Sequence, residues 1–216
     1  MSDRRTFRAA IFDLDGTLID SYDAIHASLN HVLAAFERSP VSREEVRRMV
    51  GRGLPSLIER ALGPASVDAG VELFRRHYEV AAPASTRPLA GAEEVTAELR
   101  RRGVPMAVAS NKPGVFCRQL LSGLGLADRF VAVLGPDDGY PPKPAPEMVH
   151  AALEALGSER AKTLFVGDMP IDVETARAAG LSVAVVPTGS STREELEAAR
   201  PDHLLARLED VLAFFS

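Results

Sequence analysis

Five short apolar runs recur along the chain, each followed by polar residues or glycine. They span residues 9–12, 104–109, 130–134, 163–166 and 182–186. The runs are too short for helices and lack the strict alternation of a strand with one face in water. Continuous apolar runs are typical of strands that are covered on both faces. We therefore predict five strands of a sheet that is buried between two other layers.

Helical patterns lie between the later runs. One covers residues 92–102 and is closed by Gly103, and another begins near Pro170, continues through Ala179 and is closed by Gly180. Proline near a helix start and glycine after its end are typical boundary signals. Because strand and helix alternate, the pattern predicts a parallel α/β sheet in a three-layer, Rossmann-like core.

The stretch from about residue 19 to residue 84 has a different pattern, with no convincing strand. Ser42 and Glu45 have the spacing of a capping box that opens a helix. Apolar residues repeat at helical spacing in three groups: Ile25, Leu29, Val32, Leu33 and Phe36; Leu54, Leu57, Ile58 and Leu62; and Val71, Phe74 and Tyr78.

We interpret this block of helices as a small α-helical cap domain, inserted between the first strand and the rest of the sheet. The proline-rich stretch around Pro83 and Pro88 is expected to be its return linker. Residues 1–18 and 88–216 are assigned to the α/β core domain, and residues 19–87 to the cap domain.

Composition limits the classes of partner. The 216 residues are 46% hydrophobic and 25% charged, as in ordinary globular proteins, and the net charge is −5. That charge argues against a sequence-independent nucleic-acid binder but not against a small anionic substrate. The only cysteine, Cys117, excludes an intrachain disulfide, and we expect it to pack in the core.

No stretch has the length of a secretory signal or a membrane span. We therefore expect a cytoplasmic protein with no membrane partner and no nucleic-acid partner. A monomer and a homodimer both remain open.

Polar residues follow four of the predicted strands, where ligands of open parallel sheets bind. The first strand is followed by the run DLDGT at 13–17 and the second by SNK at 110–112. Lys143 follows the third strand after a loop, Asp168 ends the fourth, and Asp172 comes one helical turn later.

This set of residues suits the cleavage of a phosphate ester. A carboxylate such as Asp13 can attack phosphorus to give an acyl phosphate. From its position two residues later, Asp15 can protonate the leaving oxygen and then deprotonate the attacking water. Because an anion attacks an anion, a divalent metal and a lysine are needed to compensate charge.

The remaining polar residues can supply that compensation. Asp13, Asp168 and Asp172 offer the hard oxygen ligands that magnesium prefers. Candidate groups for the phosphoryl oxygens are Thr17, Ser110, Asn111 and, as a compact positive charge, Lys143.

The same residues also have interpretations that involve no catalysis or binding. Asp168 and Asp172 suit the N-terminus of a helix, Ser110 and Asn111 suit a helix cap, and Lys112 can extend into solvent.

In the predicted cap, Arg52 lies between Gly51 and Gly53, from where it could reach a substrate carboxylate or phosphate. Arg47 and Arg48 nearby suggest instead that Arg52 belongs to a basic helix face.

Four motifs in this order resemble those of the haloacid dehalogenase superfamily, in its branch with a small helical cap. They are FDLDGTLIDS, SNKP, KPAP with Lys143, and FVGDMPIDVETARAAG. The resemblance implies that Asp13 is the nucleophile and Asp15 the general acid and base. It implies that Asp13, the backbone carbonyl of Asp15 and Asp168 bind magnesium, with Asp172 behind them or ligating through water. It also implies phosphate binding by Ser110, Asn111 and Lys143.

Within that family the chain is most similar to phosphoglycolate phosphatases, on motifs that include VGRGLP at 50–55 and SNKP at 110–113. The resemblance therefore implies a phosphoric monoester hydrolase for a small phosphorylated metabolite. Alternatives are a phosphomutase of the β-phosphoglucomutase type, a phosphatase for another sugar phosphate or nucleotide, a dehalogenase, and a non-catalytic binding protein.

Overall fold

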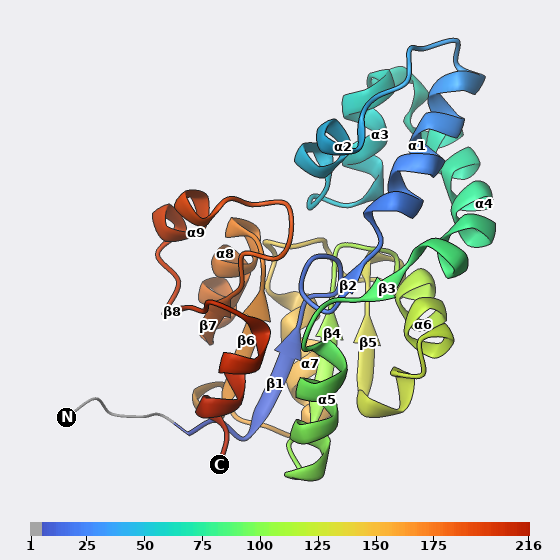
Figure 1. The fold of residues 1–216 in the computed structure, drawn as a ribbon. Coiled ribbons are helices and arrows are strands. Elements are labelled where there is room, and N and C mark those ends of the chain that lie inside the picture. Colours follow the sequence, from blue (N-terminus) through green and yellow to red (C-terminus); the bar gives the residue numbers. More distant parts are fainter. Residues whose placement is uncertain (1–5) are drawn as a thin grey trace.

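A parallel sheet forms the centre of the computed structural model, which describes residues 6–216. The strand order is β5-β4-β1-β6-β7-β8, and each neighbouring pair is parallel (Figure 1). The strands are β1 (Ala9–Phe12), β4 (Met106–Ala109), β5 (Ala132–Leu134), β6 (Thr163–Gly167), β7 (Ser182–Val185) and β8 (His203–Leu204). Every residue of β1, β4 and β6 is buried, which confirms the predicted double coverage.

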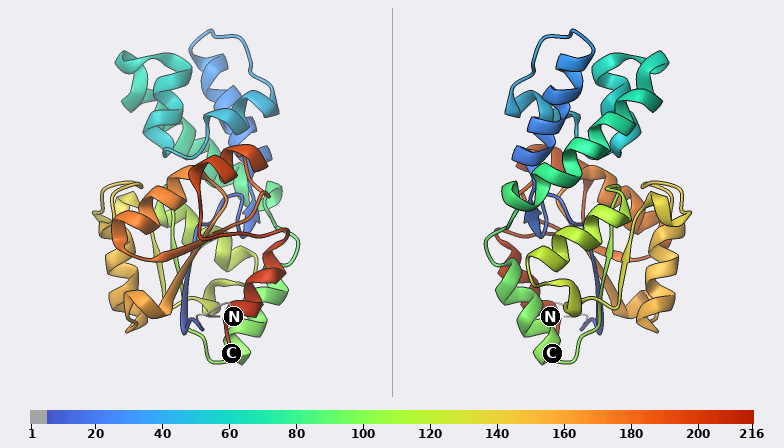
Figure 2. Two further views of the ribbon diagram at one scale, coloured as in Figure 1. Left: turned by 90° about the vertical axis from the view of Figure 1, so that its left-hand side faces the viewer. Right: turned by 90° about the vertical axis from the view of Figure 1, so that its right-hand side faces the viewer.

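Helices cover both faces of the sheet (Figure 2). One apolar cluster joins Ala10 and Phe12 of β1 to helices α5 and α6 and the 3-10 helix η5, and the other joins Ala9 and Ile11 to α7, α8 and α9. Alternate residues of the strand thus enter opposite layers. The helices are α5 (Ala92–Arg101), α6 (Gly114–Gly123), α7 (Glu147–Leu156), α8 (Pro170–Ala179), α9 (Arg193–Ala199) and η5 (Leu208–Phe214). The predicted three-layer α/β core is confirmed.

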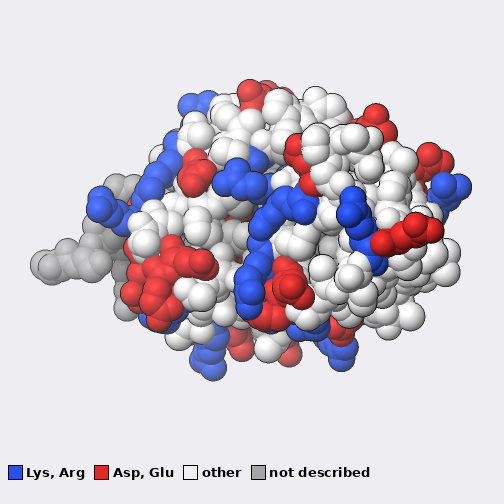
Figure 3. Space-filling model, turned by 90° about the horizontal axis from the view of Figure 1, so that it is seen from above, with Lys and Arg blue, Asp and Glu red and all other residues white. Residues whose placement is uncertain are grey.

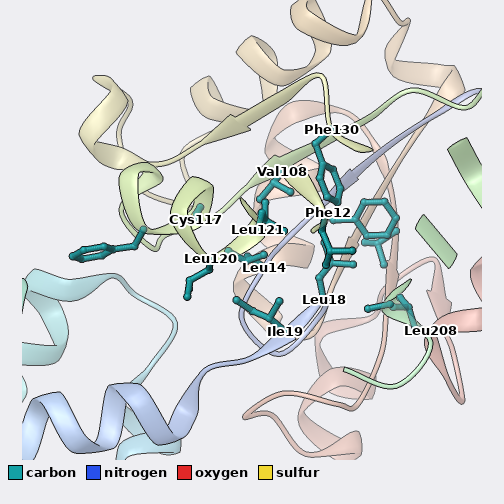
Figure 4. Packing of buried hydrophobic residues seen from close by; sticks show 14 of the residues in the cluster. Phe12, Leu14, Leu18, Ile19, Val108, Cys117, Leu120, Leu121, Phe130 and Leu208 are labelled. Atoms are coloured by element: carbon teal, nitrogen blue, oxygen red, sulfur yellow. The ribbon is translucent and has the colours of Figure 1, made fainter. Parts of the chain in front are cut away.

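Cys117 belongs to the first of these clusters. It is fully buried, and Figure 4 shows it in the same cluster as Leu120 and Leu121, with Phe12 and Phe130 further along. Burial raises the pKa of the Cys117 thiol. The expected packing role of this cysteine is therefore confirmed.

A block of helices is inserted after the first strand and lies beyond the carboxyl ends of the strands (Figure 1). Its elements are α1 (Tyr22–Ala35), α2 (Arg43–Met49), α3 (Leu54–Leu62), η1 (Pro64–Ser66) and α4 (Val67–Ser85). The predicted capping box of Ser42 and Glu45 is present at the start of α2. We call residues 22–85 the helical insertion. Its treatment as a separate domain, residues 19–87, stays a proposal, and residues 1–5 of the proposed core lie outside the described residues.

The chain enters and leaves the insertion through two short paired strands that the sequence did not reveal. β2 (Ile19–Asp20) pairs antiparallel with β3 (Arg87–Pro88). Two-residue strands are too short to show periodicity, and β8 escaped prediction for the same reason.

The predicted return linker begins later than expected. Pro83 lies inside α4 and does not end it. Proline cannot donate to the carbonyl four residues earlier, which here belongs to Glu79. The Gln119 side-chain amide of α6 donates to that carbonyl instead, at 3.4 Å. A tertiary contact therefore replaces the missing helical hydrogen bond.

Two predicted strands start later than their apolar runs. The run 104–109 becomes strand only from Met106, and the run 130–134 only from Ala132. Phe130 ends the 3-10 helix η2 (Ala127–Arg129) and packs its ring against Phe12, with centroids 6.5 Å apart. Phe130 therefore contributes to core packing just before the strand begins. The remaining 3-10 helices are η3 (Pro136–Asp138) and η4 (Arg160–Lys162).

The surface over the insertion is of mixed charge. Basic and acidic side chains are interspersed on the face seen from above (Figure 3). Within residues 6–216, no helix combines the length and the apolarity that are needed to cross a membrane.

The central strands should dominate stability. Phe165 of β6 is fully buried, so we expect Phe165→Ala to lower the free energy of unfolding by about 3–5 kcal/mol. Val131→Ala is the control, because Val131 is 57% exposed and should change stability by less than about 0.5 kcal/mol. Urea denaturation of both variants checks this, and equal midpoints would contradict it.

Candidate active site

Three neighbouring strands bring the predicted site residues together. Asp13 follows β1, Ser110 follows β4 on one side of β1, and Asp168 follows β6 on the other side. All three residues are buried. Since parallel strands end at one edge of the sheet, residues far apart in sequence converge there.

A cluster of carboxylates lies at this edge. One oxygen from each of Asp13, Asp168 and Asp172 lies within 4.8 Å of the others, and all three residues are buried. Burial, and then the neighbouring charges of Asp172 and Asp13, raise the pKa of Asp168 well above its usual value. A cluster of this kind is costly unless cations compensate it.

The cluster suits a hard divalent cation. Oδ2 of Asp168 is buried without a hydrogen-bond partner, and Oδ1 of Asp13 has the Lys143 ammonium beside it at 3.0 Å. Carboxylate oxygens are the hard ligands that magnesium prefers in proteins. The residues therefore fit a divalent metal ion between Asp13 and Asp168.

Both carboxylate oxygens of Asp172, in contrast to Oδ2 of Asp168, accept hydrogen bonds from the protein. Its Oδ2 accepts the backbone N–H groups of Asp168 and Met169, both at 3.0 Å, and its Oδ1 accepts a hydrogen bond from Lys143 Nζ at 2.7 Å. Both oxygens therefore already have donors. Asp172 holds the start of α8 and the lysine in place.

Lys143 provides the internal positive charge of the cluster. Its Nζ lies 3.0 Å from Oδ1 of Asp13 and is 2.7 Å from Asp172. Burial acts to lower the pKa of Lys143, but the carboxylates of Asp13 and Asp172 outweigh burial and raise it above its usual value. The ammonium group therefore stays charged at any physiological pH.

Two predicted phosphate-binding side chains are engaged with the protein. The Thr17 hydroxyl donates to Asp168 Oδ1 at 2.8 Å. The Asn111 side chain accepts from the Lys143 N–H at 2.6 Å and donates to the carbonyls of Lys143 and Gly51, at 3.2 and 3.0 Å. Thr17 thus orients an acid of the cluster, and Asn111 orients the lysine loop and ties it to the insertion.

Asp15 lies in the same pocket as Asp13 and is held by two donors. Its Oδ1 accepts from the Ser21 hydroxyl at 2.5 Å, and its Oδ2 pairs with Lys112 Nζ at 2.7 Å. The Lys112 side chain is only 7% exposed.

The expected extension of Lys112 into solvent is therefore wrong. The sequence placed Lys112 beside Ser110 and Asn111 at the strand end but gave no sign that its charge is buried.

A pocket opens between this edge of the sheet and the helical insertion. Asp13, Asp15, Ser110, Asn111 and Lys112 line it from the core side. The insertion supplies apolar side chains and the loop with Gly51 and Gly53. The pocket therefore joins the carboxylates to a wall that the core alone does not provide.

Arg52 is not brought into this pocket. It is exposed and does not line the cavity, although its neighbours Gly51 and Gly53 do. The arginine that crosses from the insertion to the core is Arg47. Its guanidinium donates to the Gly189 carbonyl and lies 5.0 Å from the centre of the Tyr22 ring.

The loop at Gly189 packs directly on the carboxylate cluster. The Thr188 hydroxyl donates to the Gly16 carbonyl at 2.6 Å. A Cβ at position 189 would lie 1.6 Å from Asp168 Oδ2, and one at Gly16 would lie 2.4 Å from it. Asp168 is thus enclosed by two backbone segments that only glycine allows to approach so closely.

The amino-acid sequence of the chain matches a family of hydrolases. The family described as haloacid dehalogenase-like hydrolase matches residues 10–186. A protein of Pectobacterium atrosepticum named phosphoglycolate phosphatase is 34% identical, over 98% of this chain and 94% of its own. A Rhodospirillum rubrum protein of the same name is 40% identical, over 85% and 81%.

Solved structures agree on the fold. One from Lactobacillus delbrueckii has a TM-score of 0.91 at 26% identity and covers 98% of this chain and 99% of its own. A haloacid dehalogenase-like family hydrolase from Streptococcus pneumoniae has a TM-score of 0.86 at 22% identity, covering 97% and 99%.

The close approach at position 189 is testable. We expect Gly189→Ala to displace Asp168 and to weaken magnesium binding about tenfold to a hundredfold, measured by calorimetric titration. Gly123→Ala is the control, because a Cβ there would meet no atom within 4 Å. Equal magnesium affinity in both variants, with folding verified by circular dichroism, would contradict this account of the loop.

Proposed function

The chain belongs to the haloacid dehalogenase-like hydrolase family, and we propose that it is a magnesium-dependent phosphatase that acts through a phosphorylated Asp13. The observation that carries this proposal is the position of Asp13. Its carboxylate lines the pocket together with Asp15, and its Oδ1 lies 3.0 Å from the Lys143 ammonium. We take phosphoglycolate as the first candidate substrate, because the relatives described above carry that name.

In the first step a carboxylate oxygen of Asp13 attacks phosphorus, and the bond from phosphorus to the ester oxygen breaks. Asp15 lines the same pocket and gives a proton to the leaving alcohol. In the second step Asp15 takes a proton from water, which attacks the acyl phosphate and releases inorganic phosphate. Asp13 is then regenerated.

The remaining residues bind and orient. Lys143 balances negative charge on the phosphoryl oxygens while it stays attached to Asp172. The Ser110 hydroxyl lines the pocket beside them. Because the side chain of Asn111 is engaged, its contribution to phosphate binding is a backbone N–H group.

Asp13, Asp168 and the backbone carbonyl of Asp15 are the proposed magnesium ligands, with Asp172 behind them. When bound, the ion supplies positive charge that lets a carboxylate approach a phosphate dianion. The unpartnered Oδ2 of Asp168 supports this assignment, and Thr17 holds the other oxygen of that carboxylate in place.

We further propose that the helical insertion is a cap that closes the site. It supplies one wall of the pocket, and its contacts with the core run through Asn111 to Gly51 and through Arg47 to Gly189. Closure excludes bulk water, which strengthens the electrostatic interactions inside.

The nucleophile is tested by Asp13→Asn, which keeps the shape of the side chain but weakens its attack. We expect the turnover number to fall by at least about four orders of magnitude, with an unchanged unfolding midpoint. Asp128→Asn, at an exposed position, is the matched control and should retain full activity. Substantial turnover by Asp13→Asn would remove the basis of the mechanism.

Metal dependence is tested separately. Dialysis against EDTA should abolish phosphate release, and added magnesium should restore it, because Asp13 and Asp168 otherwise face the substrate uncompensated. Phosphate release that survives EDTA would contradict the proposed role of the metal. A dehalogenase needs an aspartate nucleophile but no metal, so halide release from a haloacid in the presence of EDTA would favour that alternative.

A panel of phosphorylated metabolites, ranked by kcat/KM, addresses the remaining alternatives. A phosphatase releases inorganic phosphate, whereas a phosphomutase returns the phosphoryl group and yields an isomeric sugar phosphate. No hydrolysis of any ester in the presence of magnesium would revive the non-catalytic alternative.

A further inference from the structure

The part of the pocket beyond the carboxylates is almost entirely apolar. Its wall includes Ile25, Leu54, Leu57, Phe74, Phe116 and Met169. Among the described residues that line it, Lys112 carries the only positive charge. Any acidic group on the alcohol part of a substrate therefore has one cation to meet there.

Lys112 is held in the pocket by two polar contacts and one aromatic ring. One contact of its Nζ is to Asp15 Oδ2 at 2.7 Å, and another is to Ser21 Oγ at 3.3 Å. On its third side the ammonium faces the Tyr78 ring, 4.7 Å from the ring centre. Apolar surroundings strengthen any further charge contact of this ammonium.

Tyr78 contributes an unexplained donor at the same place. Its side chain is 1% exposed and lines the pocket, and its hydroxyl makes no hydrogen bond of ordinary geometry. Burial raises the pKa of Tyr78, although Lys112 and Ser21 lie close enough to act on this pKa and to lower it in part. Phe74 and Phe116 hold the ring, with centroids 5.4 and 5.0 Å away. A buried hydroxyl without a partner is unfavourable, so this group is suited to a ligand acceptor.

We propose that Lys112 and Tyr78 together recognise a carboxylate on the alcohol part of the substrate. This inference rests on the proposed phosphatase function and assigns substrate selection to the pair. The preferred substrates are then small phosphate esters that carry an acid group close to the ester oxygen. Arg52, which the sequence suggested for this role, is exposed and outside the pocket.

Two substrates of the same size separate this role from general catalysis. Phosphoglycolate carries a carboxylate where 2-hydroxyethyl phosphate carries a neutral CH₂OH group. We expect the wild-type protein to prefer phosphoglycolate, measured as the ratio of the two kcat/KM values. Tyr78→Phe keeps the ring and removes only the donor, and should lower this ratio about tenfold, mainly through the KM of phosphoglycolate.

The matched control is Tyr22→Phe. Tyr22 is also buried with an unpartnered hydroxyl, but it does not line the pocket, so the ratio should stay at its wild-type value. Lys112→Met should lower the ratio more than Tyr78→Phe does. Because Lys112 also contacts Asp15, this variant should slow both substrates, and the ratio isolates the recognition of the carboxylate.

The outcomes distinguish the two proposals. Hydrolysis of both esters without preference, or a ratio unchanged in Tyr78→Phe and Lys112→Met, would overturn the recognition pair and leave the phosphatase proposal standing. If the wild-type protein hydrolysed neither ester, recognition of phosphoglycolate would be overturned as well. Undiminished turnover by Asp13→Asn would count against the mechanism alone.

Discussion

The burial of several carboxylates around one ammonium group governs the rest of this structure. Asp13, Asp168 and Asp172 lie close together out of water, and Lys143 contacts two of them directly. One lysine does not compensate three acids, and burial together with the charges of Asp172 and Asp13 raises the pKa of Asp168 well above its usual value. The topology brings Asp13 and Asp168 together, because β1 lies beside β6 and both strands end at the same edge.

Much of the surrounding structure keeps these charges in position. Thr17 fixes Asp168, Asp172 fixes Lys143, and Asn111 fixes the backbone that carries the lysine. Preorganised groups of this kind need little rearrangement when charge develops in a transition state. The helical insertion supplies what the sheet edge lacks, namely an apolar wall over the acids. Because this wall is apolar, an ion pair between Lys112 and a ligand would contribute more to the binding free energy there than it would in water.

Agreement between sequence and structure is closest where local patterns decide. The apolar runs identify the strands because double burial demands them, and Gly103 and Gly180 end their helices with positive φ angles. The structure differs from the sequence prediction where a residue contacts a partner that is distant in the sequence. Pro83 lies inside a helix, and the carbonyl that it leaves without its helical donor accepts a hydrogen bond from Gln119. The side-chain amide of Asn111 donates to the carbonyls of Lys143 and Gly51, so the predicted phosphate binding at this position rests on its backbone N–H group.

By itself the sequence determined the α/β core, the inserted helices and the acids that can do the chemistry, because strand ends, glycine turns and motif spacing are local properties. Only the tertiary structure decided which side chains remain free to meet a ligand. Arg52, in a glycine-flanked loop of the insertion, lies outside the pocket. Lys112, just after the end of a strand, is buried inside it. The physical reason is that burial and charge pairing depend on which elements pack together, and chain spacing does not encode that packing directly.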